Sequence, residues 1–297
     1  MRCPILSELP PPPPERTGWP WTGNNAQLPD VNSDGRSWPR ISVVTPSFNH
    51  ARFLEATIRS VLLQGYPDLE YIIIDGGSTD GSVELIRKYE DHLACWVSES
   101  DRGQAHAINK GFARATGDIV SWLNSDDIYE SGVFRLVAEN LDPVAGPYVV
   151  FGDCLFIYER GRSMRLFRGI DRPFYRKLCY WRGWDIPQPT VFVARRVIED
   201  VGPLDESLHL AMDYEWFLRV ALHYEFLHLG QILARYRVYP GAKSGDWGAK
   251  REQFYAEMHP IAQRYWKNLP LSEYFRIRAS YAFYCLRRMG KWLRDGR

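Results

Sequence analysis

Between residues 41 and 123, short apolar runs alternate with amphipathic stretches, and this pattern constrains the fold more than any other feature of the chain. The apolar runs predict four buried strands, at 41–45, 71–74, 95–97 and 119–123. Apolar residues at helical spacing predict helices between them, at 53–62, 82–89 and 104–114. Strands that alternate with helices indicate right-handed βαβ units around a parallel sheet. The expected fold class is therefore α/β with a mostly parallel central sheet.

Acidic residues follow two of the predicted strands directly. Asp75 comes after three isoleucines, and Asp126 and Asp127 come just after the run that ends at Leu123. In open sheets of this kind, ligands bind beyond the carboxyl ends of the strands. Clustered acids repel one another unless a cation or a hydrogen-bond donor is present, and a divalent cation that bridges a diphosphate would meet that need. The alternative is that Asp126 and Asp127 cap the following turn.

Two further features allow both a structural and a functional interpretation. The glycine-rich segment 75–82 could hold a phosphate at a helix N-terminus, but it matches neither the dinucleotide nor the P-loop fingerprint, and an ordinary turn explains it equally well. Asp213 stands at the start of an amphipathic helix. Its carboxylate could cap that helix or act as a general base.

The segments outside the alternating region differ in composition. Residues 10–14 are all proline, which favours an extended polyproline conformation, and Trp19 and Trp21 follow. This arm is either a disordered tail or a segment that packs against the body of the protein or a partner. Strands are expected at 149–151 and 154–157, and the chain is expected to be helical from residue 249 onward.

Charge and cysteine content exclude some classes of protein. Lys and Arg total 37 against 36 for Asp and Glu, so the electrostatic signature of a general nucleic-acid binder is missing. Five cysteines without a CxxC pair indicate neither a disulfide framework nor a zinc site, which favours a reducing compartment and a cytoplasmic location. The sequence also has no apolar run of the kind expected for a signal peptide or a membrane span.

The C-terminal segment is basic although the whole chain is nearly neutral. Residues 271–297 contain seven Lys or Arg and two acids, a net charge of +5. This segment could contact the inner, anionic face of a membrane peripherally, or it could be a solvated helix.

Several short motifs occur together and in a fixed order. They are Pro46-Ser47-Phe48-Asn49, Ile74-Asp75-Gly76-Gly77-Ser78-Thr79-Asp80, Asp101-Arg102-Gly103-Gln104 with Asn109-Lys110-Gly111, Asn124-Ser125-Asp126-Asp127 and Asp213-Tyr214-Glu215. This series resembles family 2 glycosyltransferases, closely over residues 41–140 and more loosely to about residue 240. The resemblance implies the A-type glycosyltransferase fold, in which a Rossmann-like nucleotide half joins an acceptor half. It divides the chain into a Pro-rich arm (1–40), a nucleotide-sugar half (41–140), an acceptor half with the catalytic base (141–245) and a helical basic segment (246–297).

The resemblance also implies roles for particular residues. Asp75 would hydrogen-bond the base, typically uracil, although Gly76 stands where family members often carry a second acid. The metal-binding motif falls on residues 124–126, and because its first acid is replaced by Asn124, Asp126 becomes the main protein ligand for Mg²⁺ or Mn²⁺. Tyr239 stands where many relatives carry a histidine, which leaves Arg237 and Lys243 to hold the diphosphate.

The remaining implied contacts fall into two sets. Residues expected to surround the nucleotide-sugar are Pro46, Asn49, Ser78, Asp101, Arg102, Gln104, Asn109, Asn124 and Ser125. Residues expected to contact the acceptor are Trp181, Trp184 and Gln188.

The function that we expect is that of an inverting glycosyltransferase. Asp213 would be the general base, the donor a nucleotide-diphosphate sugar such as a UDP-sugar, and the acceptor a hydroxyl of a saccharide or lipid-linked molecule. One alternative is a catalytically inactive carbohydrate-binding module, which Asn124 and Tyr239 would favour. A sugar-1-phosphate nucleotidyltransferase is the other, although residues 45–49 lack the glycine-rich basic loop expected there.

Overall fold

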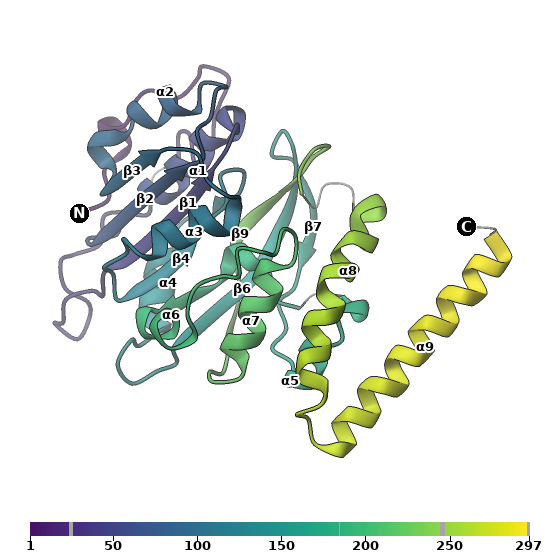
Figure 1. The fold of residues 1–297 in the computed structure, drawn as a ribbon. Helices are drawn as coiled ribbons and strands as arrows, with labels where there is room; N and C mark the ends of the chain where they lie inside the picture. Colours follow the sequence, from purple (N-terminus) through teal and green to yellow (C-terminus); the bar gives the residue numbers. More distant parts are fainter. Residues whose placement is uncertain (24–25, 184, 244–246, 296–297) are drawn as a thin grey trace.

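The computed structural model describes residues 1–23, 26–183, 185–243 and 247–295. Within these residues a single sheet of nine strands runs through the molecule, with helices on both of its faces (Figure 1). The strands are β1 (Ile41–Ser47), β2 (Leu69–Asp75), β3 (Cys95–Ser98), β4 (Ile119–Trp122), β5 (Ile128–Tyr129), β6 (Val149–Tyr158), β7 (Ser163–Phe167), β8 (Phe192–Ala194) and β9 (Leu227–Val238). The α-helices are α1 (Ala51–Leu62), α2 (Ser82–Arg87), α3 (Gln104–Phe112), α4 (Val133–Asn140), α5 (Phe174–Lys177), α6 (Arg195–Val201), α7 (Met212–Ala221), α8 (Trp247–Trp266) and α9 (Leu271–Asp295).

The strand order is β3-β2-β1-β4-β8-β6-β9-β5, and β7 pairs with the outer part of β6. β3, β2, β1 and β4 are all parallel, which confirms the α/β class and the arrangement expected from the alternating pattern. β8 is antiparallel to both β4 and β6, so the sheet as a whole is mixed. The parallel run of β3, β2, β1 and β4 therefore ends at β4, and β6 and β9 form a second parallel pair.

Several strand boundaries differ from the expectation by one or two residues, and two differences concern the loops of interest or the strand count. β1 continues through Pro46 to Ser47, because this residue pairs in register with Asp75 at the end of β2. Residues 149–151 and 154–157 belong to one strand, β6, and not to two. The pairing of β6 with β9 changes register around Asp153, and a Cβ at Gly152 would lie 2.5 Å from the carbonyl oxygen of Gln231. Glycine thus permits a close approach to β9 at the position between the two strands, 149–151 and 154–157, that the sequence suggested.

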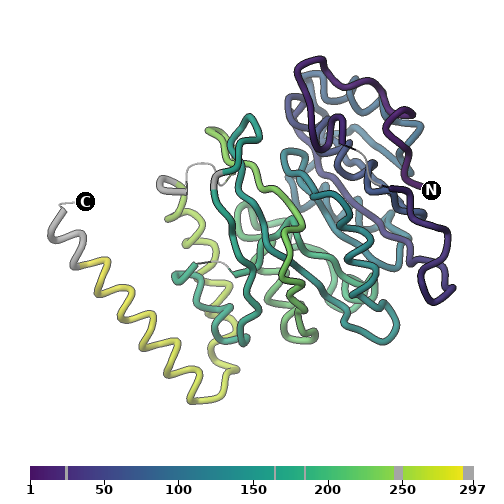
Figure 2. The backbone as a smooth tube through the Cα atoms, turned by 180° about the vertical axis from the view of Figure 1, so that it is seen from behind, coloured from purple at the N-terminus to yellow at the C-terminus, as the bar shows by residue number. Residues whose placement is uncertain are grey.

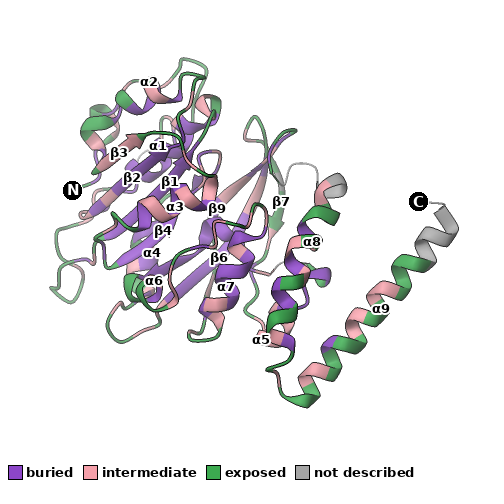
Figure 3. Ribbon diagram, in the orientation of Figure 1, coloured by how far each residue is buried: buried purple, intermediate pink, exposed green. Residues whose placement is uncertain are grey.

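Buried residues concentrate on the central strands and on the inner sides of the helices (Figure 3). All seven residues of β1 are buried. Helix α3 packs directly on β1, and a Cβ at Gly111 would lie 2.2 Å from Val44, so only glycine allows this spacing. The close packing fixes the start of α3 beside the ends of the parallel strands.

A second apolar cluster attaches the C-terminal helices to α7. Its buried members come from the 178–181 segment, α7, α8 and α9, and they include Trp181, Tyr214, Met258, Trp266 and Ile277. The helical C-terminal region expected from the sequence is therefore present. The N-terminal arm and α9 lie at opposite ends of the molecule (Figure 2).

The N-terminal arm packs against the body of the protein through a buried arginine. Arg59 on α1 is fully buried, and its guanidinium donates hydrogen bonds to the carbonyl oxygens of Pro10 at 2.8 Å, Trp21 at 3.0 Å and Pro20 at 3.1 Å. The indole of Trp19 donates to the carbonyl of Tyr129 at 2.7 Å. These contacts favour the packed form of the arm over the disordered one.

We expect Arg59→Met to reduce the free energy of unfolding by at least about 2 kcal/mol, because three buried carbonyls lose a charged donor. Urea denaturation would measure this change, and limited proteolysis would report release of the arm. Arg160→Met, which alters an exposed arginine, is the control. Equal stability and equal protease resistance for both variants would contradict the assigned role of Arg59.

Candidate active site

The carboxyl end of β2 carries a carboxylate that shapes its own loop. Asp75 is fully buried and accepts hydrogen bonds from Ser78 Oγ at 2.6 Å, Ser98 Oγ at 2.7 Å and the N–H groups of Ser78 and Gly77 at 2.9 and 3.1 Å. Both carboxylate oxygens therefore have partners within the protein. The contact between Asp75 and the base stays a prediction.

Asn49 joins the loop after β1 to the loop after β2. It adopts a left-handed conformation with φ of 52°, which asparagine tolerates better than most residues. Its N–H donates to Ser78 Oγ at 2.8 Å, and its Oδ1 accepts from the N–H of Thr79 at 2.9 Å. Pro46, in contrast, is buried inside β1. The predicted residues Asn49 and Ser78 are thus brought together at the edge of the sheet.

The structure explains the glycine at position 76. A Cβ at Gly76 would lie 2.6 Å from Asp101 Oδ2 and 3.3 Å from the Phe48 ring. A side chain at residue 76 would therefore require the Asp101 carboxylate to move. In this conformation Asp101 occupies part of the volume that a second acid would need.

A line of side-chain amides connects the start of α3 with the end of β4. Gln104 Nε2 donates to Asn124 Oδ1 at 2.7 Å, and Asn124 Nδ2 donates to Gln188 Oε1 at 3.0 Å. Gln188 Nε2 in turn donates to the carbonyl of Trp122 at 2.9 Å. Asn124 thus connects Gln104, which was predicted to contact the nucleotide-sugar, with Gln188, which was predicted to contact the sugar acceptor.

A second polar chain surrounds Asp126. Tyr239 Oη donates to Asp126 Oδ2 at 3.0 Å, and burial together with the nearby carboxylate raises the pKa of Tyr239, so the phenol stays protonated. His50 lies between Tyr239 Oη, 3.2 Å from its Nε2, and Ser125 Oγ, 2.7 Å from its Nδ1. Sequence reasoning missed His50, although it directly follows the Pro46–Asn49 motif.

Asp127, next to Asp126, is buried, and its Oδ2 lies 3.5 Å from Asn124 Nδ2. Burial and the neighbouring Asp126 raise the pKa of Asp127 well above its ordinary value. Its Oδ1 accepts a hydrogen bond from the N–H of Arg237 at 2.9 Å. Asp127 therefore connects β9 to the loop after β4, a contact that differs from capping of the following turn.

Arg237 is placed differently from the expectation. It is buried, and its guanidinium donates to the carbonyl oxygens of Glu159 at 2.6 Å and Asp126 at 2.8 Å, with the Phe53 ring centroid at 4.7 Å. In this conformation its donors support the loop that carries Asp126. The predicted contact of Arg237 with the diphosphate stays a prediction.

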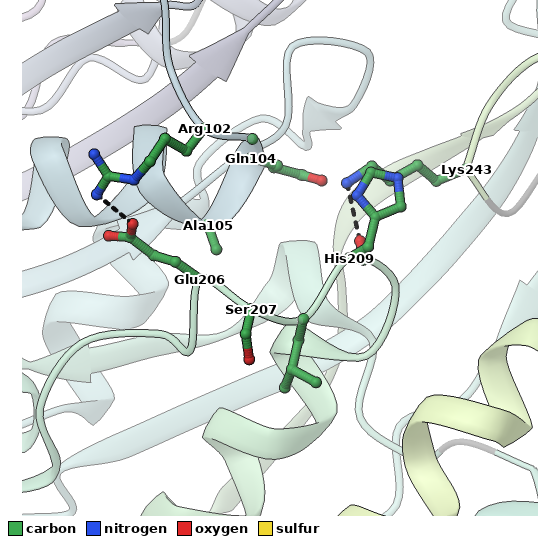
Figure 4. Close-up of a pocket in the computed structure, with 9 residues that line it drawn as sticks. Arg102, Gln104, Ala105, Glu206, Ser207, His209 and Lys243 are labelled. Atoms are coloured by element: carbon green, nitrogen blue, oxygen red, sulfur yellow. Dashed lines mark hydrogen bonds and ion pairs between the residues drawn. The ribbon is translucent and has the colours of Figure 1, made fainter.

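Three of the predicted residues line one pocket, of about 110 Å³ (Figure 4). Arg102 and Gln104 enter it from the start of α3, and Lys243 enters from the segment after β9. The opposite wall is the loop 206–209, whose Glu206 pairs with Arg102 at 2.5 Å. Lys243 Nζ donates to the carbonyl of His209 at 3.1 Å. Two cations thus flank the loop that leads into α7.

Asn109 does not line this pocket. Its Oδ1 accepts from the N–H of Leu204 at 2.9 Å, and its Nδ2 donates to the Leu204 carbonyl at 3.0 Å and to Glu206 Oε1 at 3.1 Å. It therefore positions the loop that forms the pocket wall.

Asp213 lies in the first turn of α7, directly after that loop. The pKa of Asp213 is raised to about 6, mainly because the carboxyl group is buried. The hydrogen bond from the N–H of Tyr214 and the positive charge of Lys243 lower this pKa, and the negative charge of Glu257 raises it. Glu257, on α8, accepts hydrogen bonds from the N–H groups of Leu210 and Ala211, both at 2.8 Å. Sequence reasoning missed Glu257, since only the packing of α8 on α7 reveals it.

The residues expected to contact an acceptor have separate outcomes. The Trp181 ring is 9% exposed, lies 5.0 Å from Tyr281 and 6.2 Å from Trp266, and donates to Ser280 Oγ at 3.2 Å. The Trp181 ring thus belongs to the core that holds the C-terminal helices, and its contact with an acceptor stays a prediction. Gln188 lies in the amide line described above. Trp184 is outside the described residues.

The site was compared with what Mg²⁺ and Mn²⁺ require. Among the residues that the structure describes, no group of three or more His, Cys, Asp or Glu side chains is arranged to hold a metal. Proteins often bind Mg²⁺ through one or two carboxylates together with substrate phosphates. Asp126 fits that role if the donor supplies the phosphate ligands.

None of the helices that the structure describes has the length and apolar character needed to cross a membrane.

Comparison with known proteins identifies the family. Residues 42–202, more than half of the chain, match the family described as Glycosyl transferase family 2. The chain is 32% identical over 192 residues to the "Uncharacterized glycosyltransferase MT1564" of Mycobacterium tuberculosis, covering 63% of this chain and 70% of the relative.

Two solved structures share the fold. S. aureus TarS 1–349, in complex with UDP-GlcNAc, matches with a TM-score of 0.62 and 18% identity, covering 80% of this chain and 70% of the other. The mannosyltransferase PcManGT of Pyrobaculum calidifontis, in complex with GDP-Man and Mn²⁺, matches with a TM-score of 0.52 and 20% identity over 89% and 85% of the two chains. Because the chain has the A-type fold, carries the motifs in order and matches the family model over more than half of its length, it belongs to glycosyl transferase family 2 and is a glycosyltransferase.

Proposed function

We propose that this enzyme transfers a sugar, with inversion, from a nucleotide-diphosphate donor, a UDP-sugar, to a hydroxyl of a saccharide or lipid-linked acceptor. The observation that carries the proposal is the position of Asp213. Its carboxylate has a raised pKa and lies directly after the loop that walls the pocket of Arg102, Gln104 and Lys243. The nucleotide-sugars in the complexes of TarS and PcManGT support a donor of this class.

The general base is Asp213 in this proposal. It accepts the proton of the acceptor hydroxyl while that oxygen forms a bond to the anomeric carbon. The bond from the anomeric carbon to the diphosphate breaks on the opposite face, and the nucleotide diphosphate leaves. A pKa of about 6 suits the task, because the group is ionised at neutral pH and is still basic enough to accept a proton.

Charge on the leaving diphosphate needs positive partners. Lys243 and Arg102 supply two cations at the pocket. Asp126 would hold Mg²⁺ or Mn²⁺, and the metal would neutralise charge on the diphosphate. Tyr239 and His50 keep the Asp126 carboxylate in place through their hydrogen-bonded chain.

We expect Asp213→Asn to lower sugar transfer at least about a hundredfold while donor affinity stays near that of the wild type, because the amide keeps the shape but loses the basic oxygen. Initial rates and calorimetric donor titrations would measure the two effects. Glu84→Gln, which changes an exposed carboxylate on α2, is the control. Undiminished transfer by Asp213→Asn would remove Asp213 from the mechanism.

The pH profile provides a separate test. Transfer should fall as the pH drops through about 6, because protonation of Asp213 removes the base. Glu257→Gln should move this acid limb to lower pH, because the negative charge of Glu257 raises the pKa of Asp213 and the glutamine oxygen can still accept the bonds from Leu210 and Ala211. The measurement is kcat against pH for both proteins, and identical acid limbs would contradict the coupling.

Metal dependence tests Asp126. Calorimetry with UDP should show tighter binding when Mn²⁺ is present, and Asp126→Asn should reduce that gain at least about tenfold. Glu84→Gln should preserve the gain, and a parallel titration with GDP tests the choice of base. If Asp126→Asn kept the full gain from Mn²⁺, another group would have to hold the metal.

A further inference from the structure

Helix α9 has one face that packs against the protein. Its inward residues are Tyr274, Ile277, Tyr281 and Tyr284, spaced three and four apart. Tyr281 lies 5.0 Å from Trp181 and 4.9 Å from His259, and Ile277 is fully buried. These contacts fix which side of the helix is turned outward.

The outward face of α9 is apolar. Its large side chains are strongly exposed: Leu271 (75%), Phe275 (64%), Phe283 (60%), Leu286 (61%) and Met289 (55%). Single exposed apolar side chains are common, but a stripe along several turns of one helix marks an interaction surface. Figures 1 and 3 show that α9 extends away from the body of the protein and that much of the helix is exposed.

Arginines border the apolar stripe. Arg276, Arg278 and Arg287 are exposed, and the guanidinium of Arg287 lies 5.6 Å from the centroid of the Phe283 ring. The positive charge continues beyond the helix, because Arg182 donates to Ser280 at 3.1 Å and lines a pocket of about 270 Å³ with Arg172, Arg176 and Asp185. A helix with an apolar face bordered by arginines is typical of proteins that bind the surface of a membrane.

We propose that the outward face of α9, defined by Leu271, Phe275, Phe283, Leu286 and Met289, binds the surface of a lipid bilayer that contains anionic lipids. The apolar side chains enter the boundary between headgroups and acyl chains, and the bordering arginines contact lipid phosphates. This proposal does not depend on the proposed function, since it concerns a surface away from Asp213.

The charges favour a bilayer over a second copy of this chain. Residues 271–297 contain seven basic residues and only two acids, Glu273 and Asp295. Glu273 is half-buried and lies one helical turn before the buried Ile277, on the side of α9 that packs against the protein. If two copies of the stripe were paired, arginines would face arginines without carboxylates between them, and that repulsion opposes association. An anionic lipid surface complements both the apolar and the basic part of the face.

Vesicle co-sedimentation of the full chain, without donor or acceptor, tests the proposal. We expect binding to vesicles of phosphatidylcholine with 30% phosphatidylglycerol (roughly the anionic content at which arginines contribute) and weak binding to phosphatidylcholine alone. Replacing Phe275, Phe283 and Leu286 together by serine should lower the partition coefficient at least about tenfold. A matched variant with serine at Val144, Ile170 and Leu222, which are also exposed, should bind as the wild type does.

Replacing Arg276, Arg278 and Arg287 by glutamine tests the charge. Each replacement should weaken binding to the anionic vesicles about fivefold. Circular dichroism would verify that every variant keeps its helices, and Asp213→Asn should bind vesicles normally, which separates this proposal from the proposed function. The proposal would be overturned by equal binding to both kinds of vesicle, or by unchanged binding of the variant with serine at Phe275, Phe283 and Leu286. It would also be overturned if the protein bound no vesicles and formed a dimer that this variant dissociates.

Discussion

The parallel pairing of β1 with β2 and β4 is the constraint on which the site depends. Because these strands run in the same direction, the loops that follow them meet at one edge of the sheet. Asn49, Ser78 and Asn124 then connect these loops to one another and to α3. The strands therefore place the first residues of these loops side by side, and side-chain hydrogen bonds between the loops stabilise their conformation.

The C-terminal helices contribute to the site although they lie beyond the residues that match the family. Glu257 on α8 binds the N–H groups just before α7, and the aromatic cluster around Trp181 holds α8 and α9 together. The position of Asp213 thus depends on a segment that has no motif of its own. Removal of α8 would disturb both the packing of α7 and the electrostatic environment of its first turn.

The sequence was informative where the signal is local. Hydrophobic periodicity predicted the four parallel strands and the helices between them, and the motifs located Arg102, Gln104 and Lys243, which line one pocket. Contacts between distant segments could not be predicted in this way. The chain from His50 to Tyr239 spans 189 positions, and the carbonyl partners of Arg237 come from two different loops. The packing of Trp181 in the core could not be predicted either, because aromatic content does not separate a core ring from one that stacks on a sugar.

The contact between Gly76 and Asp101 has a consequence for how this loop can vary. In this chain the carboxylate of Asp101 occupies the volume next to residue 76, between the loop after β2 and the start of α3. The identities of residues 76 and 101 are therefore interdependent, and a larger residue at one position requires a smaller or displaced one at the other. When this loop is exchanged between related enzymes, the two positions are best transferred together, because a side chain introduced at residue 76 alone has to displace the Asp101 carboxylate.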